Sequence, residues 1–158
     1  MGLNFLVNGV ALRPGAAASA DELRRAGLSP VSPLQRLLRR LPGRYDYWEA
    51  DDPHVECFDG EVSIYPCRHG YLDRDRRWGT SCLVRTQGHD LAGIEVRVLD
   101  GVYAAVNLYD RFTDAVREKL GSPHDEAKGT TLWQGHGLRV SARYQPDSHN
   151  AIFAVDLA

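Results

Sequence analysis

The sequence predicts an α+β domain of two layers, with helices packed on one face of a mostly antiparallel sheet. Several segments alternate apolar and polar residues, which is typical of strands with one buried face. Asn-Gly and Asp-Gly pairs separate such segments and favour tight hairpin turns. Helical segments with recognisable caps stand between them. The length of 158 residues fits one domain, residues 1–158.

The N-terminal part predicts a hairpin followed by a short helix. Residues 3–7 and 10–12 flank Asn8-Gly9, the pair that best tolerates the positive φ angles of a type I′ turn. Ser19, with Glu22 three residues later, forms a capping-box pattern at the start of a helix. Gly27 marks the end of that helix.

A second helix is predicted to begin at Ser32, with Pro33 at its first position. Its two faces differ in chemistry: one holds Leu34, Leu37, Leu38 and Leu41, and the other holds Arg36, Arg39 and Arg40. This amphipathic pattern predicts that the arginine face is solvated.

The middle of the chain predicts strands. Residues 54–58 and 61–65 bracket Asp59-Gly60, and residues 81–85 and 94–98 are further strand segments. Asp100-Gly101 is expected to turn the chain into a strand at residues 102–108. Residues 70–79 are polar and are expected to form a loop.

The C-terminal part predicts one helix and three strands. Residues 110–120 place Phe112, Val116 and Leu120 on one helical face before Gly121. The strands are expected at residues 130–134, 138–143 and 151–156.

A faint internal repeat accompanies these elements. Hairpin-like pairs, a helix, and then Gly27-Leu28-Ser29-Pro30 or Leu120-Gly121-Ser122-Pro123 occur in both parts, followed by Trp48 or Trp133. Two related ββ-α-ββ halves, residues 1–66 and 93–158, would explain this, as would ordinary helix-stop chemistry.

These motifs resemble those of small uncharacterised bacterial α+β domains that have an Asn-Gly hairpin, a helix ending LGxP and a tryptophan strand. The resemblance covers both ends of the chain and implies no activity. Some such domains are similar in size and composition to immunity proteins of bacterial toxin systems, which is an analogy and carries no function over.

Composition predicts a cytoplasmic bacterial protein. No basic residue precedes the apolar N-terminal segment, and no apolar run approaches the roughly 18 residues of a membrane helix, so no membrane partner is expected. Three cysteines, an odd number, favour free thiols. Only Lys119 and Lys128 among the 19 basic residues are lysines, which indicates a GC-rich genome.

The sharpest candidate for chemistry is a zinc site on the hairpin, formed by His54, Cys57, Cys67 and His69. His54 and Cys57 are three residues apart and would point to opposite faces of a strand, so the favoured interpretation is buried cysteines and surface histidines. Core packing is likewise favoured over a cysteine nucleophile for Cys82. His124-Asp125-Glu126 is expected to be a solvated turn. No cofactor or metal is expected, and the interpretation leans against an enzyme.

Charge is unevenly distributed along the chain. Residues 1–44 hold seven arginines and two acids, whereas residues 45–61 hold seven acids and no basic residue. The arginines are dispersed without aromatic residues between them, so no nucleic acid is expected as a partner. The acidic segment also carries aromatic rings, which suits an interface with a basic protein. The candidate protein-binding residues are Tyr45, Asp46, Tyr47, Trp48, Glu49, Asp51 and Asp52.

The favoured alternative for this segment is internal neutralisation, in which its acids fold back onto the arginines of residues 24–44. The function expected from the sequence is a non-catalytic protein-binding module, with an immunity-type inhibitor of a toxin as its most specific form. The alternatives are a small enzyme or zinc protein that uses the His/Cys hairpin, and a homo-oligomeric structural subunit.

Overall fold

The fold is organised around a long antiparallel sheet. The computed structural model describes residues 3–64, 79–99, 104–127, 129–146 and 150–158. Within these residues, eight strands form one sheet whose neighbours are all antiparallel. In spatial order they are β3 (Ser29–Pro30), β4 (Asp46–Asp51), β7 (Gly79–Gln87), β8 (Asp90–Leu99), β12 (Asn150–Leu157), β11 (Leu138–Gln145), β10 (Thr130–Gly135) and β9 (Asp125–Ala127).

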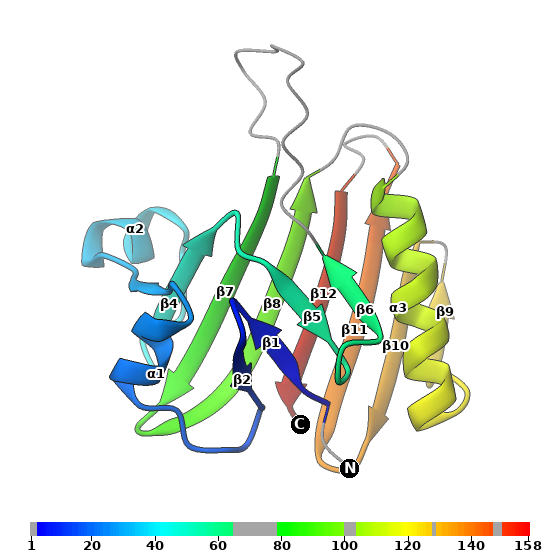
Figure 1. Ribbon diagram of the computed structural model, residues 1–158, viewed down its shortest axis with the longest axis horizontal. Helices are drawn as coiled ribbons and strands as arrows, with labels where there is room; N and C mark the ends of the chain where they lie inside the picture. The colour runs from blue at the N-terminus through cyan, green and yellow to red at the C-terminus, as the bar shows by residue number, and fades with distance from the viewer. Residues whose placement is uncertain (1–2, 65–78, 100–103, 128, 147–149) are drawn as a thin grey trace.

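A smaller sheet of four short strands lies over one face of the large sheet (Figure 1). Its order is β2 (Val10–Leu12), β1 (Phe5–Val7), β5 (Val55–Cys57) and β6 (Val62–Ile64). The predicted Asn-Gly hairpin is confirmed, because Asn8 (φ 48°) and Gly9 (φ 81°) both take the positive φ of a type I′ turn. The Asn8 side chain also donates to the Ala26 carbonyl (2.7 Å), which ties the hairpin to the first helix.

Three helices complete the described structure: α1 (Ala20–Arg25), α2 (Pro33–Leu38) and α3 (Ala104–Leu120). Both predicted caps are confirmed, since Ser19 and Glu22 form a capping box and the Ser32 hydroxyl accepts from the Gln35 N–H. None of the helices in the described part of the chain is long and apolar enough to cross a membrane.

The α+β class is confirmed, and most predicted strands are present as parts of longer ones. Residues 81–85, 94–98, 130–134, 138–143 and 151–156 lie in β7, β8, β10, β11 and β12. The hairpin around Asp59-Gly60 is confirmed as β5 and β6, with Tyr65 outside the described residues. Of the predicted loop at residues 70–79, only Gly79 is described, and it lies in β7.

The strand predicted at residues 102–108 is wrong for its described part, because α3 begins at Ala104. Ala105, Leu108, Phe112 and Val116 are all buried, at intervals of three and four residues. This helical period continues the pattern of the predicted 110–120 helix by two further turns. Two short strands, β3 and β9, and the acidic strand β4 were not predicted from their residues.

The core joins both sheets and α3 through a chain of aromatic rings. Phe58 lies 6.1 Å from Phe5 and 5.0 Å from Phe112, and Phe112 stacks on Phe153 of β12 at 4.4 Å between ring centroids. All four side chains are fully buried. Because ring pairs of this kind add stability beyond the area that they bury, this chain fixes the position of the small sheet and α3 over the large sheet.

Candidate protein-interaction surface

Helix α2 lies beside β4, near one edge of the large sheet (Figure 1), and docks through its arginines. The Arg36 guanidinium donates to the Tyr45 carbonyl (2.6 Å), lies 5.5 Å from the centre of the Tyr47 ring and is 3.9 Å from the Asp46 carboxylate. Arg39 makes a 2.6 Å ion pair with Glu49. The arginine face therefore holds α2 against the sheet.

The leucine face of α2 consequently points to solvent. Leu34, Leu37 and Leu38 are 63%, 75% and 66% exposed, and no residue of the helix is buried. The expectation of a solvated arginine face is wrong for Arg36, which is half-buried, whereas Arg39 is ion-paired but exposed. The physical reason is the chemistry of β4, whose carboxylates and rings bind guanidinium groups well but would lose hydration against leucine.

A comparison with α1 shows how unusual this orientation is. Both helices have six residues, and both end in the same backbone motif. In α1, Leu23 and the following Leu28 are almost completely buried. Of the four exposed large apolar side chains among the described residues, three belong to α2 and the fourth is Leu157. Single exposed leucines are ordinary, but a cluster of three marks a surface of interest.

The candidate binding residues of the acidic segment are split between two faces of β4. Alternation along the strand places Tyr47, Glu49 and Asp51 on one face and Asp46 and Trp48 on the other. Asp46 and Glu49 are paired with α2, as the alternative of internal neutralisation expects. Asp51 and Asp52 are exposed, and neither has an ion pair among the described residues.

The aromatic residues of the segment are covered by arginines. Tyr45 is half-buried between Arg44 and Arg85, whose guanidinium carbons lie 4.8 Å and 5.5 Å from its ring centre. Arg24 lies 5.7 Å from the centre of the half-buried Trp48 ring. Both rings are therefore half-buried beneath guanidinium groups and do not form an open aromatic patch.

Tyr47 is the most buried residue of the segment, at 3% exposure, and its hydroxyl has no hydrogen-bond partner among the described residues. Burial raises the pKa of this hydroxyl above its ordinary value, while the nearby charges of Arg85 and Arg36 lower it in part. The phenol is therefore neutral at physiological pH. It anchors β4 from within and is not available as a contact for a partner.

The hairpin does not bring a His/Cys set together within the described residues. Cys57 is fully buried, and burial together with the neighbouring Cys82 raises the pKa of its thiol well above 9.0. His54 is exposed. Cys67 and His69 lie outside the described residues, so the four-residue zinc set stays a prediction. The described residues contain no group of three His, Cys, Asp or Glu side chains that could hold a metal ion.

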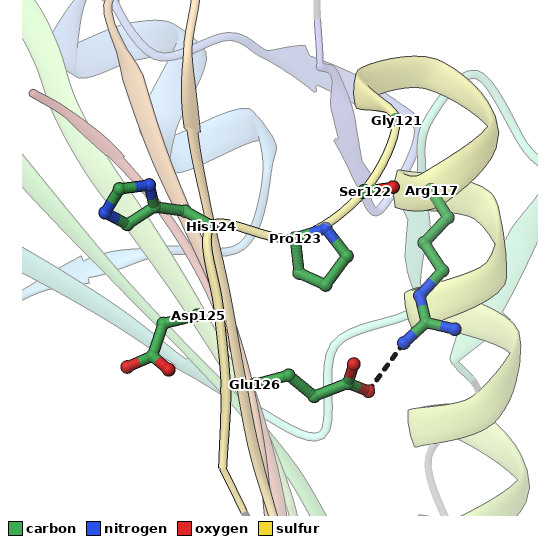
Figure 2. Close-up of a pocket in the computed structure, with 7 residues that line it drawn as sticks. All are labelled: Arg117, Gly121, Ser122, Pro123, His124, Asp125 and Glu126. Atoms are coloured by element: carbon green, nitrogen blue, oxygen red, sulfur yellow. Dashed lines mark hydrogen bonds and ion pairs between the residues drawn. The ribbon is translucent and has the colours of Figure 1, made fainter.

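A shallow hollow of about 660 Å³ lies where α3 ends (Figure 2). Arg117 makes a 2.6 Å ion pair with Glu126 across it, and the Trp133 indole N–H donates to the Gly121 carbonyl (3.2 Å). Figure 2 shows that Asp125 points away from this ion pair. The turn expected at His124-Asp125-Glu126 is wrong for Asp125 and Glu126, which belong to the edge strand β9 and pair with β10. All three residues are exposed, as expected. The arrangement offers a helix end closed by an ion pair and no nucleophile beside a base.

Comparisons with protein-family models, with curated proteins and with solved structures find no match for this chain. Its function is therefore inferred from the chemistry of its own surface.

Proposed function

We propose that this chain is a non-catalytic protein-binding module whose binding surface is the outward leucine face of α2. One observation carries the proposal: an amphipathic helix is docked by its arginines, so that Leu34, Leu37 and Leu38 face solvent. In the folded chain these three leucines remain mostly exposed, so they add little to its free energy of unfolding. Their burial against a partner would contribute roughly 1.5–3 kcal/mol for each leucine.

The chemistry of the remaining candidates supports a binding role over a catalytic one. Cys57 and Cys82 are buried, and their raised pKa values keep both thiols protonated, whereas a nucleophilic cysteine needs an accessible thiolate. The hollow at the end of α3 is lined by the Arg117–Glu126 ion pair and also by Ser122, His124 and Asp125. Figure 2 shows the His124 ring pointing away from the Ser122 hydroxyl, so this serine has no base beside it to activate it.

The experiment that tests this proposal places a photo-crosslinking amino acid at position 37 of the full chain in its native cells. The matched control carries the same group at position 157, because Leu157 is also exposed, at 43%, but lies on β12. A protein cross-linked from position 37 and not from position 157 is purified, and its affinity is measured by calorimetry. Leu37→Ser should weaken binding roughly tenfold or more, whereas Leu157→Ser should not.

The more specific form of this function is an immunity-type inhibitor that captures a basic toxin. Asp51 and Asp52 support it, because both carboxylates are exposed and free of ion pairs within the described residues. Charge reversal by Asp51→Lys should then lower the on-rate for a basic partner, since exposed charges steer association. A partner that binds Asp51→Lys as fast as the wild type would remove this form and leave the leucine surface intact.

The finer architecture belongs to the proposal as well. Packing of α3 and the small sheet over the same face of the large sheet supports a two-layer description (Figure 1). The two related halves, residues 1–66 and 93–158, gain little support, because residues 104–108 are helical where the repeat expects a strand. A homo-oligomer would be detected by light scattering of the purified chain.

A further inference from the structure

Resting on this proposed function, we infer that α2 binds as a helix in a groove, into an apolar groove of another protein whose rim is acidic. The anchors are Leu34, Leu37 and Leu38. They occupy positions i, i+3 and i+4, the spacing by which amphipathic helices fill such grooves. All three are exposed, and the helix ends at Leu38.

The sign of the rim follows from the arginines around these anchors. Arg36 and Arg39 are already neutralised by Asp46 and Glu49. Arg40 and Arg44, which follow the helix, are exposed and have no ion pair among the described residues, although the Arg44 guanidinium lies over the Tyr45 ring. Two cations without a carboxylate partner in the described residues therefore follow the C-terminal end of α2, and carboxylates on the partner protein would complement them.

A second copy of this chain fits the surface less well. A specific interface buries about 800 Å² on each partner, more than one face of a six-residue helix presents to a second copy of the same helix. A groove solves this problem, because its walls also contact the flanks of the helix.

An anionic membrane surface also fits less well. Arg40 and Arg44 are the two basic residues just beyond α2 that have no ion pair among the described residues. Segments that bind anionic lipids typically carry a cluster of about four to eight Lys or Arg residues. An acidic groove needs fewer cations, because its carboxylates can each face one arginine.

The backbone at the end of α2 places Arg40 beside the anchors. The Arg40 N–H donates to the Leu37 carbonyl (3.1 Å) and the Leu41 N–H to the Arg36 carbonyl (3.0 Å), which is the Schellman motif. Arg40 takes φ 51° at the position where glycine is usual. The same position of α1 is occupied by Gly27. Position 40 therefore carries an arginine although a glycine would adopt this backbone conformation with less strain.

The test uses the full chain with the photo-crosslinking group at position 37, and maps the partner peptide that it captures. The expected peptide lines an apolar groove with Asp or Glu at its rim. In stopped-flow measurements with the purified partner, Arg40→Glu combined with Arg44→Glu should lower the on-rate roughly tenfold at low salt, and the difference should shrink as salt rises. Arg40→Lys is the matched control and should retain most of the wild-type rate.

Each other outcome is decisive. Cross-links from position 37 to another copy of this chain would show that a second copy, and not a groove, covers α2. Binding to vesicles of phosphatidylcholine and phosphatidylglycerol that Leu37→Ser abolishes would show that a membrane covers it. A basic captured peptide, or on-rates unaffected by both glutamate changes while Leu37→Ser still weakens binding, would overturn the acidic rim and leave the binding function standing. Equal cross-linking from positions 37 and 157 would overturn the binding function itself.

Discussion

Arg85 on β7 and Asp156 on β12 form an ion pair that passes over Gly93 on the intervening strand β8. The strand register places Gly93 directly between the two residues. A side chain at position 93 would collide with the Asp156 carboxylate and the Arg85 guanidinium. Because glycine has no side chain, Arg85 and Asp156 can meet across the intervening strand β8. The same guanidinium lies over the ring of Tyr45, the residue before β4 whose carbonyl accepts a hydrogen bond from Arg36 of α2.

Gly93→Ala should open this ion pair. Alanine in a strand is more favourable than glycine by roughly 0.5–1 kcal/mol, and a partly exposed ion pair contributes a similar amount. The single change should therefore alter the free energy of unfolding only slightly. In an Arg85→Ala background, where the pair is already lost, Gly93→Ala should stabilise the protein by roughly 0.5–1 kcal/mol. Urea unfolding of the four proteins in this double-mutant cycle measures the coupling, and equal effects in both backgrounds would contradict it.

The orientation of α2 can be tested by making the same change in two helices of equal length. Leu23→Ala in α1 removes a side chain that is 1% exposed and should destabilise the protein by roughly 2–5 kcal/mol. Leu37→Ala in α2 removes one that is 75% exposed and should change the free energy of unfolding by less than about 0.5 kcal/mol. If denaturant unfolding gave similar losses for both variants, the leucine face of α2 would be buried.

The helix ends give a second matched pair. Arg40→Gly should stabilise the protein by several tenths of a kcal/mol to about 1 kcal/mol, because glycine adopts positive φ without the steric cost of a side chain. Gly27→Ala should destabilise it by more than about 1 kcal/mol, since φ is 80° there and the added Cβ would lie 2.8 Å from the Asn8 amide nitrogen. Thermal unfolding should shift in opposite directions for the two variants. Shifts of the same sign would contradict the assigned backbone geometry.

The sequence predicted the elements best where a side chain reports on its own backbone. Asn8-Gly9, Ser19 and Ser32 fix local turns and caps through contacts within a few residues, and all three predictions are confirmed. The strand predicted at residues 102–108 failed because Asp100-Gly101 resembles a hairpin signal, while the helical spacing of Ala105 and Leu108 becomes clear only together with Phe112.

The candidate site could be located from the sequence more readily than it could be oriented. The acidic segment and the arginines were identified as a pair of opposite charges, and their contact at Arg36 and Arg39 follows that pattern. Which face of α2 packs against the sheet depends on β4, the second strand from one edge. Its carboxylates Asp46 and Glu49 pair with the arginines of α2. Helical periodicity reports that two faces differ but carries no information about the surface that receives them.

The buried thiols predict a loss of stability at alkaline pH. Burial, with the charge of Glu95, raises the pKa of Cys82 from 9.0 to about 12, and the pKa of Cys57 is raised well above 9.0. Above pH 9 the unfolded chain releases these protons while the folded chain keeps them, so the unfolded state is favoured. The free energy of unfolding should be constant with respect to both thiols below pH 8 and should fall above pH 9 by up to roughly 1.4 kcal/mol per pH unit for each thiol.

Guanidinium unfolding between pH 8 and 10 measures this slope. Tyr47, whose pKa is also raised from its ordinary 10.0, adds to the decline near pH 10, but it does so equally in both proteins compared and cancels in their difference. The control is a Cys57→Ala and Cys82→Ala double variant, in which the decline should be much smaller although the protein starts from a lower stability. Cys67, which lies outside the described residues, is replaced by serine in both proteins so that it cannot contribute.

In the same Cys67→Ser protein, a thiol reagent at pH 8 should label neither Cys57 nor Cys82 until denaturant is added, because both thiols are buried and protonated in the native fold. Equal slopes in the two proteins, or rapid labelling of the native state, would show that these cysteines are not part of the core.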